Sequence, residues 1–108
     1  MSDIRFRDAN LPGKKIYVTE WGWDSDGAGE NCTFGECVSE NEQALYGVRA
    51  AMMFLRLGVD RSNWYFYGNQ PSGSLYSRCG LESTSHQNKK SYYAFQSLIS
   101  KIGNKYFL

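Results

Sequence analysis

The sequence has 108 residues, which is enough for one domain or for part of one. Hydrophobic residues make up 42%, as in an ordinary globular protein. The 12 Lys and Arg residues and the 11 Asp and Glu residues leave a net charge of +1, which excludes the basic surface of a nucleic-acid binder. Aromatic residues make up 16%, and such a surplus needs either a large core or a ligand surface.

The first 14 residues are polar and end in a turn signal, Pro12-Gly13. The next segment, Ile16 to Thr19, has an apolar or β-branched residue at every position. Such a run predicts a short strand that is covered on both faces, as the strands of parallel sheets are.

Gly, Asp, Ser and Asn are frequent from Gly22 to Val38. This composition predicts a loop of roughly fifteen residues, and loops of that length in compact domains are mostly functional or disordered. Cys32 and Cys37 lie close enough within the loop to pair, which would leave Cys79 as a free thiol. Three reduced thiols fit the sequence equally well, because one local pair says little about the redox compartment.

The acidic stretch from Asp24 to Asn31 lies in the same loop but does not predict a metal site. Gly27 falls two positions too early for the calcium loop of an EF-hand. Cys32 and Cys37 have no histidine or second cysteine pair with which to hold zinc. We therefore expect neither a metal nor another cofactor.

A capping box marks the start of a helix after this loop. The Ser39 hydroxyl can accept from the backbone N–H of Glu42 while the Glu42 side chain reaches back. Gly58 fits the C-terminal end of the helix. Arg49 and Arg56 interrupt the apolar run of the helix, which is therefore too charged to cross a membrane. The residues with helical spacing that predict a buried stripe are Ala44, Val48, Ala51, Met52 and Leu55.

The rest of the chain predicts a second strand and a second helix. The strand is Asn63 to Tyr67, and a polar loop to about Gln87 follows it. The helix runs from about Lys89 to Ile102, with Gly103 as its stop. The order strand, helix, strand, helix predicts an α/β fold with parallel strands.

Two βα units make a poor domain by themselves. A two-stranded parallel sheet has open edges and leaves one face of its core uncovered. We therefore expect further strands, or self-association of the chain, to cover these edges.

Glu20 directly follows the first predicted strand. In parallel α/β folds, functional groups collect where the loops leave the carboxyl ends of the strands, so this glutamate is a candidate catalytic residue. A structural interpretation is equally open, in which Glu20 caps the loop or pairs with an arginine such as Arg49.

Aromatic residues are frequent around the same strand ends. Trp21 and Trp23 follow the glutamate, and Trp64 begins a run of four aromatic residues that ends at Tyr67. Aromatic faces stack on the C–H faces of sugars, and Trp and Tyr also offer a polar group. Because strand residues alternate between the two faces, only about half of these rings can face a ligand. The pattern indicates a surface that binds carbohydrate.

Three segments of the chain together resemble a known enzyme family. They are IYVTEWGWDS, which begins at Ile16, SENEQALYGVRAAMMFLRLGVDRSNWYFYGN, which begins at Ser39, and GLESTSHQNKKSYYAFQSLISKIG, which ends at Gly103. Their order and spacing resemble the last quarter of a clan A glycoside hydrolase, a retaining glycosidase with a (β/α)8 TIM barrel. The resemblance implies that residues 1–108 are the C-terminal part of a catalytic barrel, from strand seven to helix eight.

By this resemblance Glu20, in its T-E-x-G segment, matches the catalytic nucleophile, and Trp64 matches a tryptophan that lines the sugar subsite. Tyr65, Tyr67 and Asn69 are by position candidate hydrogen-bond donors to Glu20. The substrate-binding residues expected in all are Trp21, Trp23, Trp64, Tyr65, Tyr67 and Asn69.

The second catalytic carboxyl group of the family is missing. Its acid/base glutamate ends strand four in an Asn-Glu pair, whereas Asn41-Glu42 of this chain lies in the capping box of a helix. We therefore infer a fragment that carries the nucleophile and does not hydrolyse glycosides efficiently by itself. The alternative is a non-catalytic carbohydrate-binding or interaction module of the same α/β type.

The same resemblance sets the expected partners and compartment. They are an oligo- or polysaccharide and the remaining strands of the parent barrel, with neither nucleic acid nor a membrane. The resemblance implies a secreted or periplasmic parent enzyme, and the compartment of this chain itself stays open.

Overall fold

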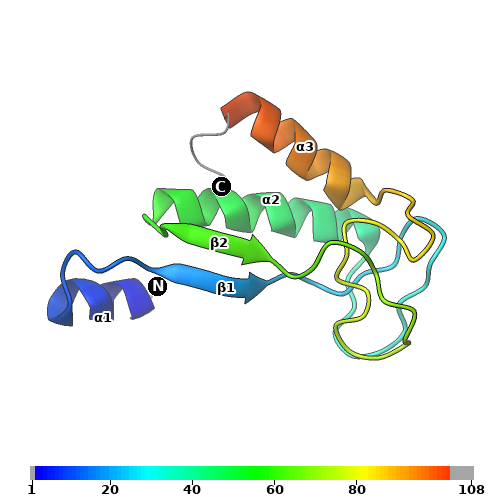
Figure 1. Cartoon of the computed structure of the whole chain (residues 1–108), viewed down its shortest axis with the longest axis horizontal. Helices are drawn as coiled ribbons and strands as arrows, with labels where there is room; N and C mark the ends of the chain where they lie inside the picture. Colours follow the sequence, from blue (N-terminus) through cyan, green and yellow to red (C-terminus); the bar gives the residue numbers. More distant parts are fainter. Residues whose placement is uncertain (1, 103–108) are drawn as a thin grey trace.

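The computed structural model describes residues 2–102, and Figure 1 shows their arrangement. The elements are α1 (Ser2–Asn10), β1 (Tyr17–Trp21), α2 (Glu40–Arg56), β2 (Arg61–Trp64) and α3 (Lys90–Ile102). This part of the chain is mixed α/β, with three helices and a two-stranded parallel sheet. The predicted α/β class with parallel strands is confirmed, and α1 precedes the predicted elements.

The sequence does not predict α1. No apolar stripe marks this helix, and its Phe6 side chain is exposed. Asp3 in the first turn and Arg7 in the last turn both complement the helix dipole. The predicted turn at Pro12-Gly13 is confirmed, and Gly13 has φ +82°, which glycine adopts without steric strain.

Both strands are displaced from their predicted positions. β1 covers Tyr17–Trp21 rather than residues 16–19, and β2 covers Arg61–Trp64 rather than residues 63–67. An apolar run marks the residues that are suited to burial. The limits of a strand instead depend on which backbone groups find partners across the sheet.

Only one face of the sheet is covered by helices. Phe54 of α2 and Phe95 of α3 both pack against the indole of Trp21. Tyr17 and Thr19 of β1 are exposed. The prediction of a strand covered on both faces is therefore wrong for the described residues, because α2 and α3 lie over one face only.

The predicted capping box of α2 is confirmed. Ser39 is the N-cap residue, and its hydroxyl oxygen accepts from the Glu42 N–H at 3.1 Å. The hydroxyl also donates to the Glu42 carboxylate at 2.9 Å. Gly58, just after the helix, has φ +75°, as a helix C-terminus requires.

The predicted stripe of α2 is buried only in part. Ala51 is buried, and Ala44, Val48 and Leu55 are half-buried. Met52 is 54% exposed, so its predicted burial is wrong within the described residues. The helix therefore presents apolar side chains to solvent.

The second predicted helix is α3, which begins at Lys90 and packs against α2. Its predicted stop, Gly103, lies outside the described residues. Neither these two helices nor α1 is long and apolar enough to cross a membrane.

Two long loops meet beyond the carboxyl ends of the strands (Figure 1). The first loop is residues 22–39, and the second loop is residues 65–89. The Ser25 N–H of the first loop donates to the Arg78 carbonyl of the second at 3.1 Å. A disulfide joins Cys32 to Cys37, with a Cα–Cα distance of 5.9 Å, whereas Cys79 is a buried free thiol. The two loops thus pack as one unit at this end of the sheet.

Candidate functional site

Glu20 lies within β1, one residue before the carboxyl end of the strand, rather than after the strand as predicted, and it is exposed. Within residues 2–102 its carboxylate accepts no hydrogen bond and forms no ion pair, including none with Arg49. The residue lines a pocket of about 250 Å³ whose other walls are Trp21, Gly22, Tyr65, Tyr76 and Cys79. The carboxylate can therefore meet a ligand beside two tyrosine rings.

The pairing of β1 with β2 shifts register between Val18 and Trp21, the segment that contains Glu20. Val18 pairs with Ser62 and Trp21 pairs with Trp64, so β1 holds one residue more than β2 between these pairs. Such a bulge changes the side to which the following side chains point. Here Glu20 is exposed while Trp21 is half-buried.

Trp21 and Trp64 belong to a packed group of rings that we call the aromatic cluster. Its members are Trp21, Trp23, Phe54, Trp64 and Phe95. The ring centroids of Trp21 and Trp64 are 5.1 Å apart, and those of Trp64 and Phe95 are 5.2 Å apart, in both cases edge to face. The Trp64 Nε1–H donates to the Cys79 carbonyl at 2.9 Å.

The aromatic cluster joins the sheet to α2 and α3. Trp21 also reaches the Glu20 pocket, and Trp23 lines a neighbouring pocket of about 390 Å³. Trp64 lines neither of these two pockets. The structure shows that Trp21, Trp23 and Trp64 pack against other aromatic rings. Contact of any of the three with a sugar stays a prediction.

The three predicted donors to Glu20 lie in different places. Tyr65 lines the Glu20 pocket, whereas Tyr67 lies in a groove against α3, with Tyr92 and Phe95. Asn69 is buried, and its side chain donates to Glu30 at 3.4 Å and accepts from the Gly80 N–H at 2.8 Å. Of the three, Tyr65 alone shares the pocket of Glu20.

Tyr76 and Cys79 are pocket residues that the sequence does not reveal. Both belong to the second loop, and both line the Glu20 pocket and its 390 Å³ neighbour. Each is a single residue of its type in a polar segment, without a motif around it. Only the folding of the second loop onto the first brings them to Glu20.

Asp24 holds this part of the second loop in place. It is 7% exposed, and its carboxylate accepts from the backbone N–H of Tyr76 at 2.7 Å and of Arg78 at 2.8 Å. The Cys79 thiol also donates to it, at 3.4 Å. A buried carboxylate with several donors is both satisfied and rigid, so Asp24 positions the pocket residues.

Cys79 is unsuited to nucleophilic chemistry although it lines the pocket. Burial and the nearby charge of Asp24 raise the pKa of its thiol to about 12. A thiol with so high a pKa stays protonated at neutral pH, and the thiolate is the reactive form.

Two further buried polar side chains connect the loops to the helices. Lys89 is fully buried, and its ammonium group donates to the carbonyls of Arg78 at 3.0 Å and Ser25 at 3.4 Å. Burial lowers the pKa of Lys89 to about 8, although nearby acidic groups oppose the shift. Gln43 of α2, also fully buried, donates to the Trp23 carbonyl at 2.9 Å and accepts from the Ser91 hydroxyl at 3.0 Å.

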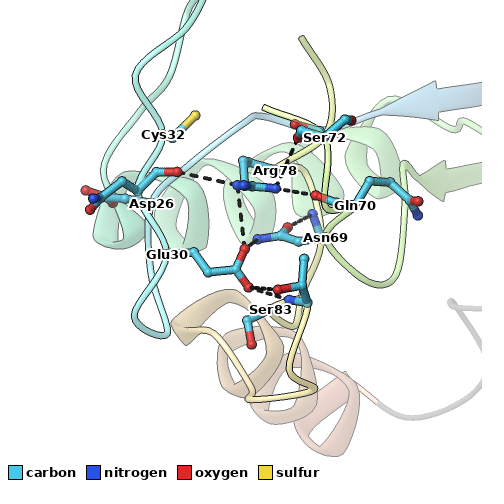
Figure 2. A network of polar contacts seen from close by, with 12 residues as sticks. Asp26, Glu30, Cys32, Asn69, Gln70, Ser72, Arg78 and Ser83 are labelled. Carbon is cyan, nitrogen blue, oxygen red and sulfur yellow. Dashed lines mark hydrogen bonds and ion pairs between the residues drawn. The ribbon is translucent and has the colours of Figure 1, made fainter. Parts of the chain in front are cut away.

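Figure 2 shows a network of polar contacts around Glu30 of the first loop. Its carboxylate accepts from Asn69 and from the Thr84 hydroxyl at 3.0 Å, and it lies 3.5 Å from Arg78 Nε. Burial raises the pKa of Glu30, but these hydrogen bonds and the Arg78 charge outweigh it and hold the pKa below its ordinary value. Glu30 is therefore an ionised structural residue that ties the second loop to the first.

The described residues offer no group of three or more His, Cys, Asp and Glu side chains that could hold a metal ion. In the first loop, Asp24 and Glu30 accept from backbone and side-chain donors of the second loop instead.

Comparisons of the chain with protein-family models, with curated proteins and with solved structures find no match. The observations that bear on function are therefore those around Glu20. The structure contains an accessible carboxylate near the carboxyl end of a parallel strand, beside two tyrosines of the second loop.

Proposed function

We propose that the chain is the C-terminal part of a retaining glycoside hydrolase that acts on an oligo- or polysaccharide, with Glu20 as the nucleophile. The single observation that carries the proposal is the Glu20 pocket, in which an accessible carboxylate lies beside Tyr65 and Tyr76. Carboxylates do the chemistry of glycosidases, and aromatic rings stack on sugars.

The proposal includes the architecture of a partial (β/α)8 barrel made of its last two βα units. The parallel pairing of β1 and β2, with α2 between them in the chain, is what such units require. The exposed apolar side chains of α2 and the uncovered face of the sheet support a parent protein that covers them. The exposed residues in question are Leu45, Met52 and Met53.

The chemistry assigns Glu20 one half of a two-carboxylate reaction. Its oxygen attacks the anomeric carbon and forms a glycosyl ester while the bond to the leaving oxygen breaks, and a second carboxylic acid protonates that oxygen. The second group has to lie roughly 5–5.5 Å away. Glu20 is the sole carboxyl residue among the described residues that line its pocket, so the acid/base has to come from elsewhere in the parent.

The test uses the protein expressed from the full reading frame that contains these residues. An activated 2-fluoro-glycoside traps the glycosyl ester, and intact mass with peptide mapping locates it. Labelling at Glu20 that Glu20→Gln abolishes is the expected result. Glu42→Gln is the matched control and should label normally, because glutamine also serves in a capping box. Absence of label on Glu20 in an active glycosidase would overturn the proposal.

The second candidate is a non-catalytic carbohydrate-binding module. The absence of a second carboxyl residue from the described lining of the Glu20 pocket favours it for the isolated chain. It predicts reversible sugar binding that Glu20→Gln leaves unchanged, and no covalent label in any longer form of the protein.

A further inference from the structure

Tyr76 lies at the meeting point of three neighbouring hollows. It lines the Glu20 pocket of about 250 Å³, the pocket of about 390 Å³ and a third pocket of about 490 Å³ that extends to Gln70 and Ser72. We call these three pockets together the Tyr76 cleft. Pockets for small ligands begin at about 300 Å³, and the three hollows share Tyr76 as a common wall, so together they offer room for more than one sugar unit.

The Tyr76 side chain is 63% exposed although its backbone is held firmly. Its N–H donates to the buried Asp24 carboxylate at 2.7 Å. Its φ is +67°, a conformation that costs a non-glycine residue about 1 kcal/mol or more. A strained backbone that presents an exposed ring is a feature found at ligand-binding sites.

The side chain of the neighbouring Leu75 packs against Gly35 of the first loop. A Cβ atom at Gly35, inside the disulfide-closed segment, would collide with the Leu75 side chain. The position of Tyr76 is therefore determined from two sides, by Asp24 and by the packing of Leu75 against Gly35. The backbone that presents the ring is therefore already ordered, and a ligand that stacks on the ring does not have to order it.

The charge of the Tyr76 cleft limits the chemistry of its ligand. Its charged residues, among those described, are the acids Glu20, Asp24 and Glu36, and no Lys, Arg or His lines it. Beside the cleft, the Arg78 guanidinium donates to the carbonyls of Gln70 and Ser72 and lies 3.5 Å from the Glu30 carboxylate, so this cation is already paired. A sulfated or uronate sugar would therefore meet acidic groups without an unpaired cation, whereas an uncharged sugar meets no such repulsion.

We infer that the Tyr76 cleft binds an uncharged oligosaccharide, with Tyr76 as a stacking platform between the sugar at Glu20 and the sugars beyond it. This inference rests on the proposed function, because it places the reacting sugar at Glu20. It adds that the substrate is uncharged, that it extends over more than one sugar unit, and that Tyr76 contributes to specificity.

The test measures binding of the chain to cellohexaose, mannohexaose and neoagarohexaose, and to hexagalacturonate as the anionic probe, by NMR titration. At least one neutral hexaose should bind, more tightly than its disaccharide and than hexagalacturonate. Tyr76→Ala should weaken that binding about 10-fold, because one aromatic contact contributes roughly that factor. The matched control is Tyr93→Ala, since Tyr93 is an exposed tyrosine on α3 that lines none of the three pockets.

Each outcome decides a different question. Unchanged binding by Tyr76→Ala, or tighter binding of hexagalacturonate, overturns the inference and leaves the glycosidase proposal intact. Failure of every neutral hexaose, when the full-length protein is labelled at Glu20, also overturns the inference alone. Failure of the hexaoses together with absence of label on Glu20 overturns both.

Discussion

Glu20 differs in exposure from its neighbour in β1, Trp21. The register shift in β1 leaves its carboxylate exposed while its neighbour Trp21 enters the aromatic cluster. A carboxylate without a partner among residues 2–102 adds little to folding stability. The proposed role as nucleophile would account for a carboxylate that no described contact requires.

Glu20→Gln should leave the free energy of unfolding unchanged within about 0.5 kcal/mol, because no described contact is lost. Urea denaturation measures this value. A loss of about 2 kcal/mol or more would favour a structural role for the carboxylate. Asp24→Asn is the positive control, since it should cost about that amount by weakening two hydrogen bonds to backbone N–H groups.

Lys89 should make stability depend on pH in the alkaline range. Its folded pKa is about 8 and its ordinary value is 10.5, so between these values the unfolded chain binds more protons. Stability therefore rises with pH there, by up to about 1.4 kcal/mol per pH unit. Cys79 acts in the opposite sense, because its pKa rises from 9.0 to about 12 and the unfolded thiol loses its proton first.

A Cys79→Ala background isolates the Lys89 effect. In it, the free energy of unfolding should increase from about pH 8 to about pH 9.5. Adding Lys89→Met should remove that increase. Equal pH profiles for the single and double variants would contradict the assignment, and chemical denaturation at each pH provides the comparison.

At the scale of elements, the aromatic cluster determines how α2 and α3 approach the sheet. Gly47 of α2 lies where a Cβ atom would come within 3.0 Å of the Phe95 ring and 3.2 Å of the Trp64 ring. The close packing of α2 against these rings therefore depends on a residue without a side chain. Its sequence neighbours are apolar, so the pattern alone does not identify this contact.

Gly47→Ala should destabilise the protein by about 1 kcal/mol. Alanine favours the helix by up to about 1 kcal/mol, but the packed rings leave no room for its methyl group, and overpacking costs about 1–3 kcal/mol. Thermal or urea denaturation measures the sum. Gly73→Ala, at a site with open space around it, should change stability by less than about 0.5 kcal/mol. A Gly47→Ala variant more stable than the wild type would show that the rings can move apart.

The molecule as a whole is elongated, with principal extents of 45 × 30 × 18 Å, and its sheet has two strands. Its largest fully buried side chains are polar, and they lie in the two loops, as Lys89 and Ser25 do, or on the helices, as Gln43 does. Few apolar side chains are fully buried among the described residues. This distribution favours a unit that completes its core with other strands or with a second copy.

The isolated chain should therefore associate in solution. Sedimentation velocity at about 50 µM should give a mean mass above the 12.3 kDa of one chain. Replacing Leu45 and Met52 of α2 by lysine should lower that mass towards 12.3 kDa, because the charges oppose burial of this face. Phe6→Lys, on α1, is the control. A monomeric wild type would contradict the expectation.

The local features followed from the sequence because they depend on neighbouring residues. The capping box at Ser39 and Glu42 and the glycine at position 58 each need only a few consecutive residues. The parallel order of the strands followed from the alternation of strand and helix patterns.

Contacts between residues far apart in the chain, and the exposure of individual side chains, are determined by the tertiary structure. Asp24 and Tyr76 are separated by 52 positions, and only the meeting of two loops joins them and brings Tyr76 to Glu20. The exposure of Tyr17 and Met52 likewise depends on which surfaces the rest of the chain covers. The sequence by itself determined the parallel α/β class and the two longer helices, whereas the limits of the strands, α1 and the residues around Glu20 depend on long-range packing, because local patterns carry no information about distant contacts.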